Sequence, residues 1–375
     1  MTDAAYAAPS PARAQSAFDG TIIAAALALI GAGMVLSLAA TPTITQRIAA
    51  DNAFALSIKH AAFALGGMAL IAVAASFDAR LVRRVGFVVM VGAAALVALT
   101  LVVTPERNGA ARWLDLGPLS VQPSEALKPG LVIFWAWMLS EQMRRPGFPG
   151  RALACASFTI VAFLLLLQPD VGQTLLLFAV LSAMLLMSGL SWRWVLGLGG
   201  GALATPPIAY ALFPHVRARI DAWFGEPSEQ VSRALDAIAA GGLFGRGPGE
   251  GVIKRQLPDA HADFIYAVAA EEFGLLASIG LIALYAALTW RGLSRASRLI
   301  DPFAQLATAG LTTLIAAQAV IHIAVNTSLA PAKGMTLPFV SYGGSSMLSA
   351  CLCVGFILAL TRARPGAYLY PESQR

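Results

Sequence analysis

The chain is 375 residues long, 58% of them hydrophobic and 12% charged, and its net charge is +6. Soluble domains carry about 45–50% apolar and about 25% charged residues. The composition therefore excludes a disordered chain, a coiled coil and a disulfide-rich scaffold, and it disfavours a soluble enzyme. It predicts an all-α polytopic membrane protein, because each crossing needs about 20 apolar residues. No basic run is interleaved with aromatic residues, so nucleic acid is not an expected partner.

Segment 1–19 is rich in Ala, Pro and Ser and is expected to be a flexible cytoplasmic tail. Apolar runs and short polar breaks then alternate over a single membrane domain, 20–362, and 363–375 forms a second cytoplasmic tail. The runs predict about ten transmembrane helices, at residues 20–40, 56–76, 85–104, 123–141, 152–168, 172–190, 192–213, 263–290, 303–329 and 340–361.

The basic residues predict the orientation, since Lys and Arg are enriched in cytoplasmic loops. With both termini in the cytoplasm, most basic residues of the short segments lie on the cytoplasmic side: Arg13, Arg80, Arg83, Arg84, Arg144, Arg145, Arg151, Arg193, Arg291, Arg295, Arg298, Arg362, Arg364 and Arg375. The short outer loops hold Arg47, Lys59, Arg107, Arg112 and Lys333. Segment 214–262 is then a large extracytoplasmic loop between the seventh and eighth helices of a plasma-membrane protein.

This large loop has two recognisable parts. Residues 229–240 are amphipathic, with Val231, Leu235 and Ile238 on one helical face. The glycine-rich stretch 241–251 follows, and it favours either a turn or a close approach of backbone N–H groups to an anion. We expect a partly re-entrant loop that lies against the membrane.

Charges inside membrane spans are expensive, so each is a functional hypothesis. Glu125 and Lys128 stand three residues apart and are neighbours on a helix, either as a structural ion pair or as part of a binding site. Asp263 opens the eighth span on the outer side, where an aspartate commonly serves as a helix cap. Glu271 and Glu272 lie deeper in that span, and at least one faces protein, as a packing contact or as a functional group.

No metal site is indicated. Cys155, Cys351 and Cys353 lie in apolar stretches and behave as small hydrophobic residues. Neither they nor the four histidines have the spacing of metal ligands. No cofactor is identified, and dependence on a divalent cation is left open.

Several segments, in the right order, resemble the SEDS family (FtsW, RodA and their sporulation relatives). They are 111–114 with 122–125, 168–172, 242–247, 257–264, 271–274 and 333–346. The resemblance runs from about residue 20 to residue 362. Segment 333–339, Lys-Gly-Met-Thr-Leu-Pro-Phe, is more similar to the division members than to RodA. The chain departs from the family pattern at Ala262, Tyr266 and His322, where Thr, Phe and Asn are the usual residues.

The resemblance implies a peptidoglycan glycosyltransferase that polymerises lipid II, an undecaprenyl-pyrophosphate disaccharide-pentapeptide, at the outer face of the plasma membrane at the septum. Asp263 corresponds to the catalytic acidic residue of the family and would act as general base on the acceptor sugar hydroxyl. Cations would stabilise the departing pyrophosphate. The candidate substrate-binding residues are Arg112, Glu125, Lys128, Arg246, Lys254, Arg255, Glu271, Lys333 and Ser341.

The resemblance also implies partners, namely a class B penicillin-binding protein as transpeptidase and other divisome proteins. Two other functions fit ten helices with central charges: a lipid II flippase, and a non-catalytic divisome scaffold. A flippase is expected to place charges along several spans, whereas this chain places Asp263 beside a basic, glycine-rich loop on one face.

Overall fold

The computed structural model describes residues 18–47, 54–104, 112–117, 119–190, 229–331 and 334–362, with scattered residues between 193 and 225. Most of the expected span 192–213, Lys333 and most of both expected tails lie outside the described residues. The elements in chain order are α1 (Gly20–Arg47), α2 (Ala55–Ala75), α3 (Ala79–Val103), β1 (Leu114–Leu116), β2 (Leu119–Val121), α4 (Pro123–Arg144), α5 (Gly150–Leu167), α6 (Val171–Met187), α9 (Glu229–Gly241), the 3-10 helix η2 (Ile253–Gln256), α10 (Ile265–Ala296), α11 (Pro302–Asn326) and α12 (Gly344–Thr361).

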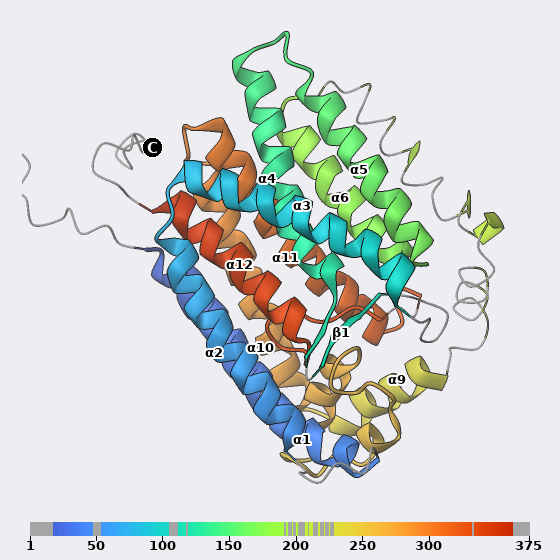
Figure 1. Cartoon of the computed structure of the whole chain (residues 1–375). Helices are drawn as coiled ribbons and strands as arrows, with labels where there is room; N and C mark the ends of the chain where they lie inside the picture. The colour runs from blue at the N-terminus through green and yellow to red at the C-terminus, as the bar shows by residue number, and fades with distance from the viewer. Residues whose placement is uncertain are drawn as a thin grey trace, which may run out of the picture.

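The described part of the chain is a bundle of helices, as the composition predicted (Figure 1). Seven described helices are long and apolar enough to cross a membrane: α1, α2, α3, α5, α10, α11 and α12. α6 is apolar but shorter, and α4 carries polar residues. Together these nine helices correspond to nine of the ten predicted spans. The outer surface of the bundle is apolar, with side chains such as Leu65, Val102 and Ile160 largely exposed, which suits a surface that faces lipid.

Helix α4 runs through the middle of the bundle and packs against α3, α5, α6, α11 and α12. Leu127, Leu131, Trp135 and Leu139 recur every four residues and are all fully buried. Residues at this spacing share one face of a helix, but the neighbouring positions are buried too. The polar residues Ser124, Glu125 and Lys128 of α4 are therefore enclosed by protein and not by lipid.

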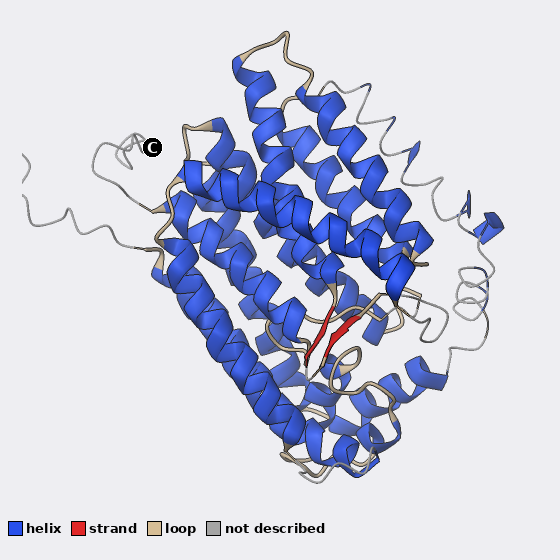
Figure 2. Cartoon of the chain, viewed as in Figure 1, coloured by secondary structure: helices blue, strands red, loops and turns tan. Residues whose placement is uncertain are grey.

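A small antiparallel hairpin precedes α4, where the sequence pattern predicts no strand (Figure 2). Leu114 pairs with Val121, and Leu116 pairs with Leu119. Gly117, at φ +72°, takes a backbone conformation at the tip that favours glycine. The hairpin lies at the same end of the bundle as α9 (Figure 1).

The opposite end of the bundle gathers the chain segments that the orientation assigned to the cytoplasm. Asp19, just before α1, accepts hydrogen bonds from Arg291 and Arg295 near the end of α10, at 2.7 and 2.5 Å. The guanidinium of Arg362, just after α12, lies 5.0 Å from the ring centroid of Phe18. The chain therefore enters α1 and leaves α12 at the same end, as an even number of crossings requires.

Helix α10 is interrupted at Gly274, where φ is +79° and ψ is −175°. The break frees backbone groups, and the loop after α9 satisfies them. Arg246 N and Gly247 N donate to Glu271 O and Glu272 O, and Leu275 N donates to Gly242 O. The predicted amphipathic helix is present as α9, and the glycine-rich stretch is packed into the break in α10.

Candidate active site

Asp263 lies in a turn just before α10, and its side chain is only partly exposed. Its backbone N–H donates to Asp259 O at 3.0 Å, and its carbonyl accepts from Asn326 Nδ2 at 3.0 Å. The carboxylate lies against Gly334: a Cβ added to that glycine would be 2.7 Å from Asp263 Oδ2. Hydrogen bonds to its backbone therefore fix the position of Asp263, and its carboxylate faces the segment that precedes α12.

The alternative interpretation of Asp263, as the cap of the eighth helix, is wrong. The helix begins at Ile265, and its N-cap residue is Phe264, which makes no side-chain capping bond. The acceptor comes from another helix: Ala267 N donates to Asn326 Oδ1 of α11 at 3.2 Å. Because Asn326 supplies the cap, the first turn of α10 does not require the carboxylate of Asp263.

The segment 334–343 is fastened to the turn that carries Asp263. Ser341 Oγ accepts from Leu337 N at 2.7 Å and donates to Ala262 O at 2.6 Å. Tyr342 N donates to His261 O at 2.9 Å. Burial lowers the pKa of His261, and the carboxylate of Asp259 partly opposes that shift. Ser341, a candidate substrate ligand, thus uses its hydroxyl to hold this segment next to Asp263.

Glu125 and Lys128 form the ion pair that their spacing predicted. Lys128 Nζ lies 2.8 Å from Glu125 Oε2, and both side chains are almost completely buried. Glu125 Oε1 also accepts from Gln173 Nε2 of α6 at 3.2 Å, and Ser349 Oγ of α12 donates to Glu125 O at 2.7 Å. The pair therefore joins α4 to α6, and the backbone of Glu125 joins α4 to α12.

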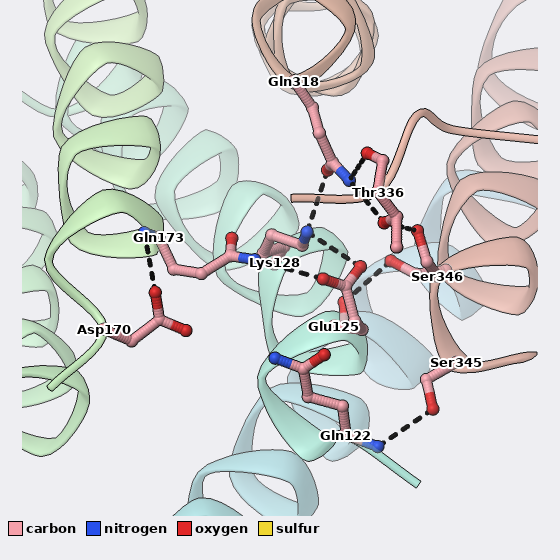
Figure 3. Close-up of polar contacts among 10 residues, drawn as sticks. Gln122, Glu125, Lys128, Asp170, Gln173, Gln318, Thr336, Ser345 and Ser346 are labelled. Carbon is pink, nitrogen blue, oxygen red and sulfur yellow. Dashed lines mark hydrogen bonds and ion pairs between the residues drawn. The ribbon is translucent and has the colours of Figure 1, made fainter. Parts of the chain in front are cut away.

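The network continues from Lys128 to the segment that faces Asp263 (Figure 3). Lys128 Nζ donates to Gln318 Oε1 of α11 at 2.8 Å. Gln318 Nε2 then donates to Thr336 O at 3.1 Å, and Thr336 Oγ1 donates to Ser346 Oγ at 2.7 Å. Thr336 is two residues from Gly334, so a short stretch of chain connects the buried cation to the neighbourhood of the carboxylate.

Lys254 and Glu271, two other candidate ligands, form hydrogen bonds and an ion pair within the protein. Glu271 accepts from the backbone N–H groups of Ile253 and Lys254 at 2.7 and 2.8 Å. Lys254 forms an ion pair with Glu272 and donates to Ala39 O of α1 at 2.8 Å. All three charged residues are at most 1% exposed. They bind the loop that follows α9 to α10 and α1, and we assign them a structural role.

Arg112 also contacts protein: its guanidinium donates to Gln168 O at 2.9 Å and to Pro169 O at 2.6 Å, and it lies 3.8 Å from Asp170 Oδ2. It therefore stabilises the turn between α5 and α6. Arg246 and Arg255 are exposed on the loop between α9 and α10.

In the part of the chain that the structure describes, no three His, Cys, Asp or Glu side chains are grouped in a way that could hold a metal ion. Sequence reasoning also missed several residues that complete the site, namely Gln173, Gln318, Asn326, Thr336 and Ser346. The signal that points to two of them is the four-residue spacing of Gln318, His322 and Asn326 in an otherwise apolar helix.

Comparisons with known proteins identify the family of the chain. A model of the FtsW/RodA/SpoVE family, described as "Cell cycle protein", matches residues 20–365. The probable peptidoglycan glycosyltransferase FtsW of Caulobacter vibrioides is 45% identical over 353 residues, which cover 93% of this chain and 90% of that protein. The protein of the same name from Halomonas elongata is 34% identical over 357 residues, with 91% and 89% covered.

Solved structures show the same fold. A chain of a structure described as "Structural coordination of polymerization and crosslinking by a peptidoglycan synthase complex" superposes with a TM-score of 0.74 at 28% identity, covering 92% of this chain and 98% of that one. The rod shape determining protein RodA of Thermus thermophilus superposes with a TM-score of 0.69 at 28% identity, with 92% and 97% covered. The chain is therefore a polytopic helical membrane protein and belongs to the FtsW/RodA/SpoVE family, the SEDS family that its motifs resemble.

Proposed function

We propose that this chain is a peptidoglycan glycosyltransferase that polymerises lipid II into glycan strands during septal wall synthesis. The proteins most similar to it among the relatives above carry the name of this activity and of the division protein FtsW. The observation that carries the mechanism is the position of Asp263, whose carboxylate is partly exposed, is not used as a helix cap, and faces a segment tied to a buried cation.

In the proposed reaction, Asp263 accepts the proton of the attacking sugar hydroxyl of the acceptor. That oxygen forms a bond to the anomeric carbon of the donor. The bond between this carbon and the phosphate oxygen breaks, and undecaprenyl pyrophosphate leaves with the bonding electrons. The proton on Asp263 then passes to solvent, so that the carboxylate is restored for the next addition.

The departing pyrophosphate needs cations, because negative charge develops on it as the bond breaks. We assign this task to Lys128, with Glu125 holding its ammonium group, and to the exposed Arg246 and Arg255 of the outer loop together with Lys333. An ammonium has three N–H donors, and Glu125 and Gln318 take two of those of Lys128. The third is the donor that we assign to a phosphate oxygen.

The proposed location is the plasma membrane, with both termini in the cytoplasm and Asp263 on the outer face. The charge pattern supports this, since most short-loop basic residues lie on the side assigned to the cytoplasm. We further propose a class B penicillin-binding protein as the transpeptidase partner, within the divisome. The superposition on a chain of a peptidoglycan synthase complex supports such an assembly.

The direct test is to incubate the purified protein with lipid II, with and without that transpeptidase, and to separate the products by gel. Glycan strands made by the pair support the proposal, because neither a flippase nor a scaffold forms a glycosidic bond. The same preparation in vesicles that contain fluorescent lipid II measures transbilayer movement. Movement without polymer would instead establish the flippase function. If neither movement nor polymer is detected, the scaffold function remains.

A further inference from the structure

Helix α11 carries three polar side chains at a spacing of four residues. Gln318, His322 and Asn326 are 4%, 1% and 0% exposed. Residues at this spacing lie on one face of a helix, one above the other. Buried polar groups in a membrane helix cost free energy unless they are hydrogen-bonded, so the contacts of these three side chains decide their role.

The three side chains reach successive parts of the site. Asn326, closest to the Asp263 turn, donates to Asp263 O and accepts from Ala267 N. His322 Nδ1, one helical turn away, donates to Met335 O at 2.6 Å. Gln318, one turn further, accepts from Lys128 Nζ and donates to Thr336 O. One face of one helix therefore contacts the turn of the carboxylate, the facing segment and the buried cation.

The amide of Gln318 can satisfy both of its neighbours in only one orientation. The ammonium of Lys128 is a donor without acceptor capacity, and the carbonyl of Thr336 is an acceptor without donor capacity. Oε1 must therefore face Lys128 and Nε2 must face Thr336, as Figure 3 shows. Exchanging the two amide groups would place donor against donor and acceptor against acceptor.

We infer that Gln318 is a positioning residue for glycan transfer, which sets the direction of the remaining N–H of Lys128 relative to the segment that faces Asp263. This inference rests on the proposed function. The three N–H bonds of an ammonium point in tetrahedral directions, so fixing two of them on Glu125 and Gln318 fixes the third. Because Gln318 is also bonded to Thr336, the cation and the facing segment are aligned to each other by one side chain.

Such alignment acts on the rate of the chemical step more than on the binding of lipid II, since a misplacement of about 1 Å can cost roughly 10²-fold in rate.

Gln318→Met keeps a similar length but makes neither hydrogen bond. Gln318→Glu keeps an acceptor for Lys128 and loses the donor to Thr336 O. Thr336→Val removes the Thr336 hydroxyl, which donates a hydrogen bond to Ser346. Gln305→Met, on the opposite end of α11, is the matched control.

The experiment measures kcat and KM for lipid II with the transpeptidase present, after thermal unfolding has shown which variants are folded. We expect both Gln318 variants to lower kcat by about 10- to 10²-fold with KM within a few-fold of wild type, and Gln305→Met to be unchanged. The double variant Gln318→Glu/Thr336→Val should lose little more than the more affected single variant, because the two residues act as one unit.

Wild-type kcat in a folded Gln318→Glu protein would overturn the inference, as would losses that multiply fully in the double variant. If Gln318→Met does not fold, Gln318→Glu still decides the question, because it retains the bond to Lys128. An inactive wild type would instead contradict the proposed function itself, so the two failures are distinguishable.

Discussion

Lys128 holds a positive charge at a position that is 1% exposed, and Glu125 beside it is 4% exposed. Removing one partner of a well-buried ion pair leaves the other charge uncompensated, at a cost of about 3–5 kcal/mol. Removing both charges avoids that cost, because no isolated charge remains. The pair therefore allows stability and catalysis to be separated by substitution.

We predict that Lys128→Met lowers thermal stability and abolishes polymerisation of lipid II. The double variant Glu125→Gln/Lys128→Met should regain most of the stability and remain inactive, since the cation for the pyrophosphate is still missing. Thermal unfolding and gel-based polymerisation on the same preparations check both statements. If the double variant recovers polymerisation, the pair is structural, and normal activity of Lys128→Met would remove it from the mechanism.

The sequence predicted the residues of this site best where the interaction is local. The i,i+3 spacing of Glu125 and Lys128 was sufficient to predict their ion pair. It could not predict that Asn326 caps α10, because its partner Ala267 is far away in the sequence and meets it only through tertiary packing. For the same reason the sequence allowed a cap role for Asp263, and it did not predict that the candidate ligand Lys254 pairs with Glu272.

Among the elements, the junction between the glycine-rich loop and the broken helix α10 depends most on particular residues. Gly245 has φ +81°, and a Cβ added there would lie 2.1 Å from the carbonyl oxygen of Glu272. Gly249 has φ +85°, but an added Cβ would meet no atom within 4 Å. Comparing a substitution at Gly249 with one at Gly245 thus separates the cost of backbone strain from the cost of a steric clash.

We predict that Gly249→Ala lowers the free energy of unfolding by about 1 kcal/mol, through strain alone. Gly245→Ala should lower it by at least about 2 kcal/mol, because it adds overlap with backbone atoms that cannot move aside. Thermal unfolding in detergent provides the comparison. Equal losses in the two variants would show that the loop does not dock into the break in α10 as described.

The sequence predicted the approximate span of this helix but not the break within it. Residues 265–296 are a long apolar stretch, and a single glycine in a membrane helix is common. What interrupts the helix at Gly274 is the loop 242–247, which supplies backbone partners for the freed groups. The hairpin of β1 and β2 was missed because its strands are only three residues each, too short for an alternating pattern.

At the scale of the whole molecule, the charged ends of the bundle indicate how it lies in the membrane. The ion pairs of Asp19 with Arg291 and Arg295, and of Arg144 with Asp301, are grouped at the end that holds the entry to α1 and the exit from α12. Asp263 and the loop between α9 and α10 lie at the other end. The arginine-rich end is the one assigned to the cytoplasm.

We predict that a cysteine at Glu250 is labelled from outside intact cells by a membrane-impermeant maleimide, and that a cysteine at Ser297 is labelled only after the cells are opened. Both positions are exposed, and they lie at opposite ends of the bundle. The substitutions Glu250→Cys and Ser297→Cys are made in a Cys155→Ser background, because Cys155 is the exposed native cysteine among the described residues. The reverse labelling pattern would place Asp263 on the cytoplasmic side.

The central claim is that Asp263 takes the proton of the acceptor hydroxyl, and Asp263→Asn tests it most directly. The substitution keeps the size of the side chain, and because Asn326 caps α10, it should leave the fold intact. Asp259→Asn, in the same turn and exposed, is the matched control. With equal thermal stability and lipid II binding, Asp263→Asn should polymerise lipid II about 10²–10⁴-fold more slowly than wild type, and Asp259→Asn at the wild-type rate. Polymerisation by Asp263→Asn within a few-fold of wild type would contradict the account.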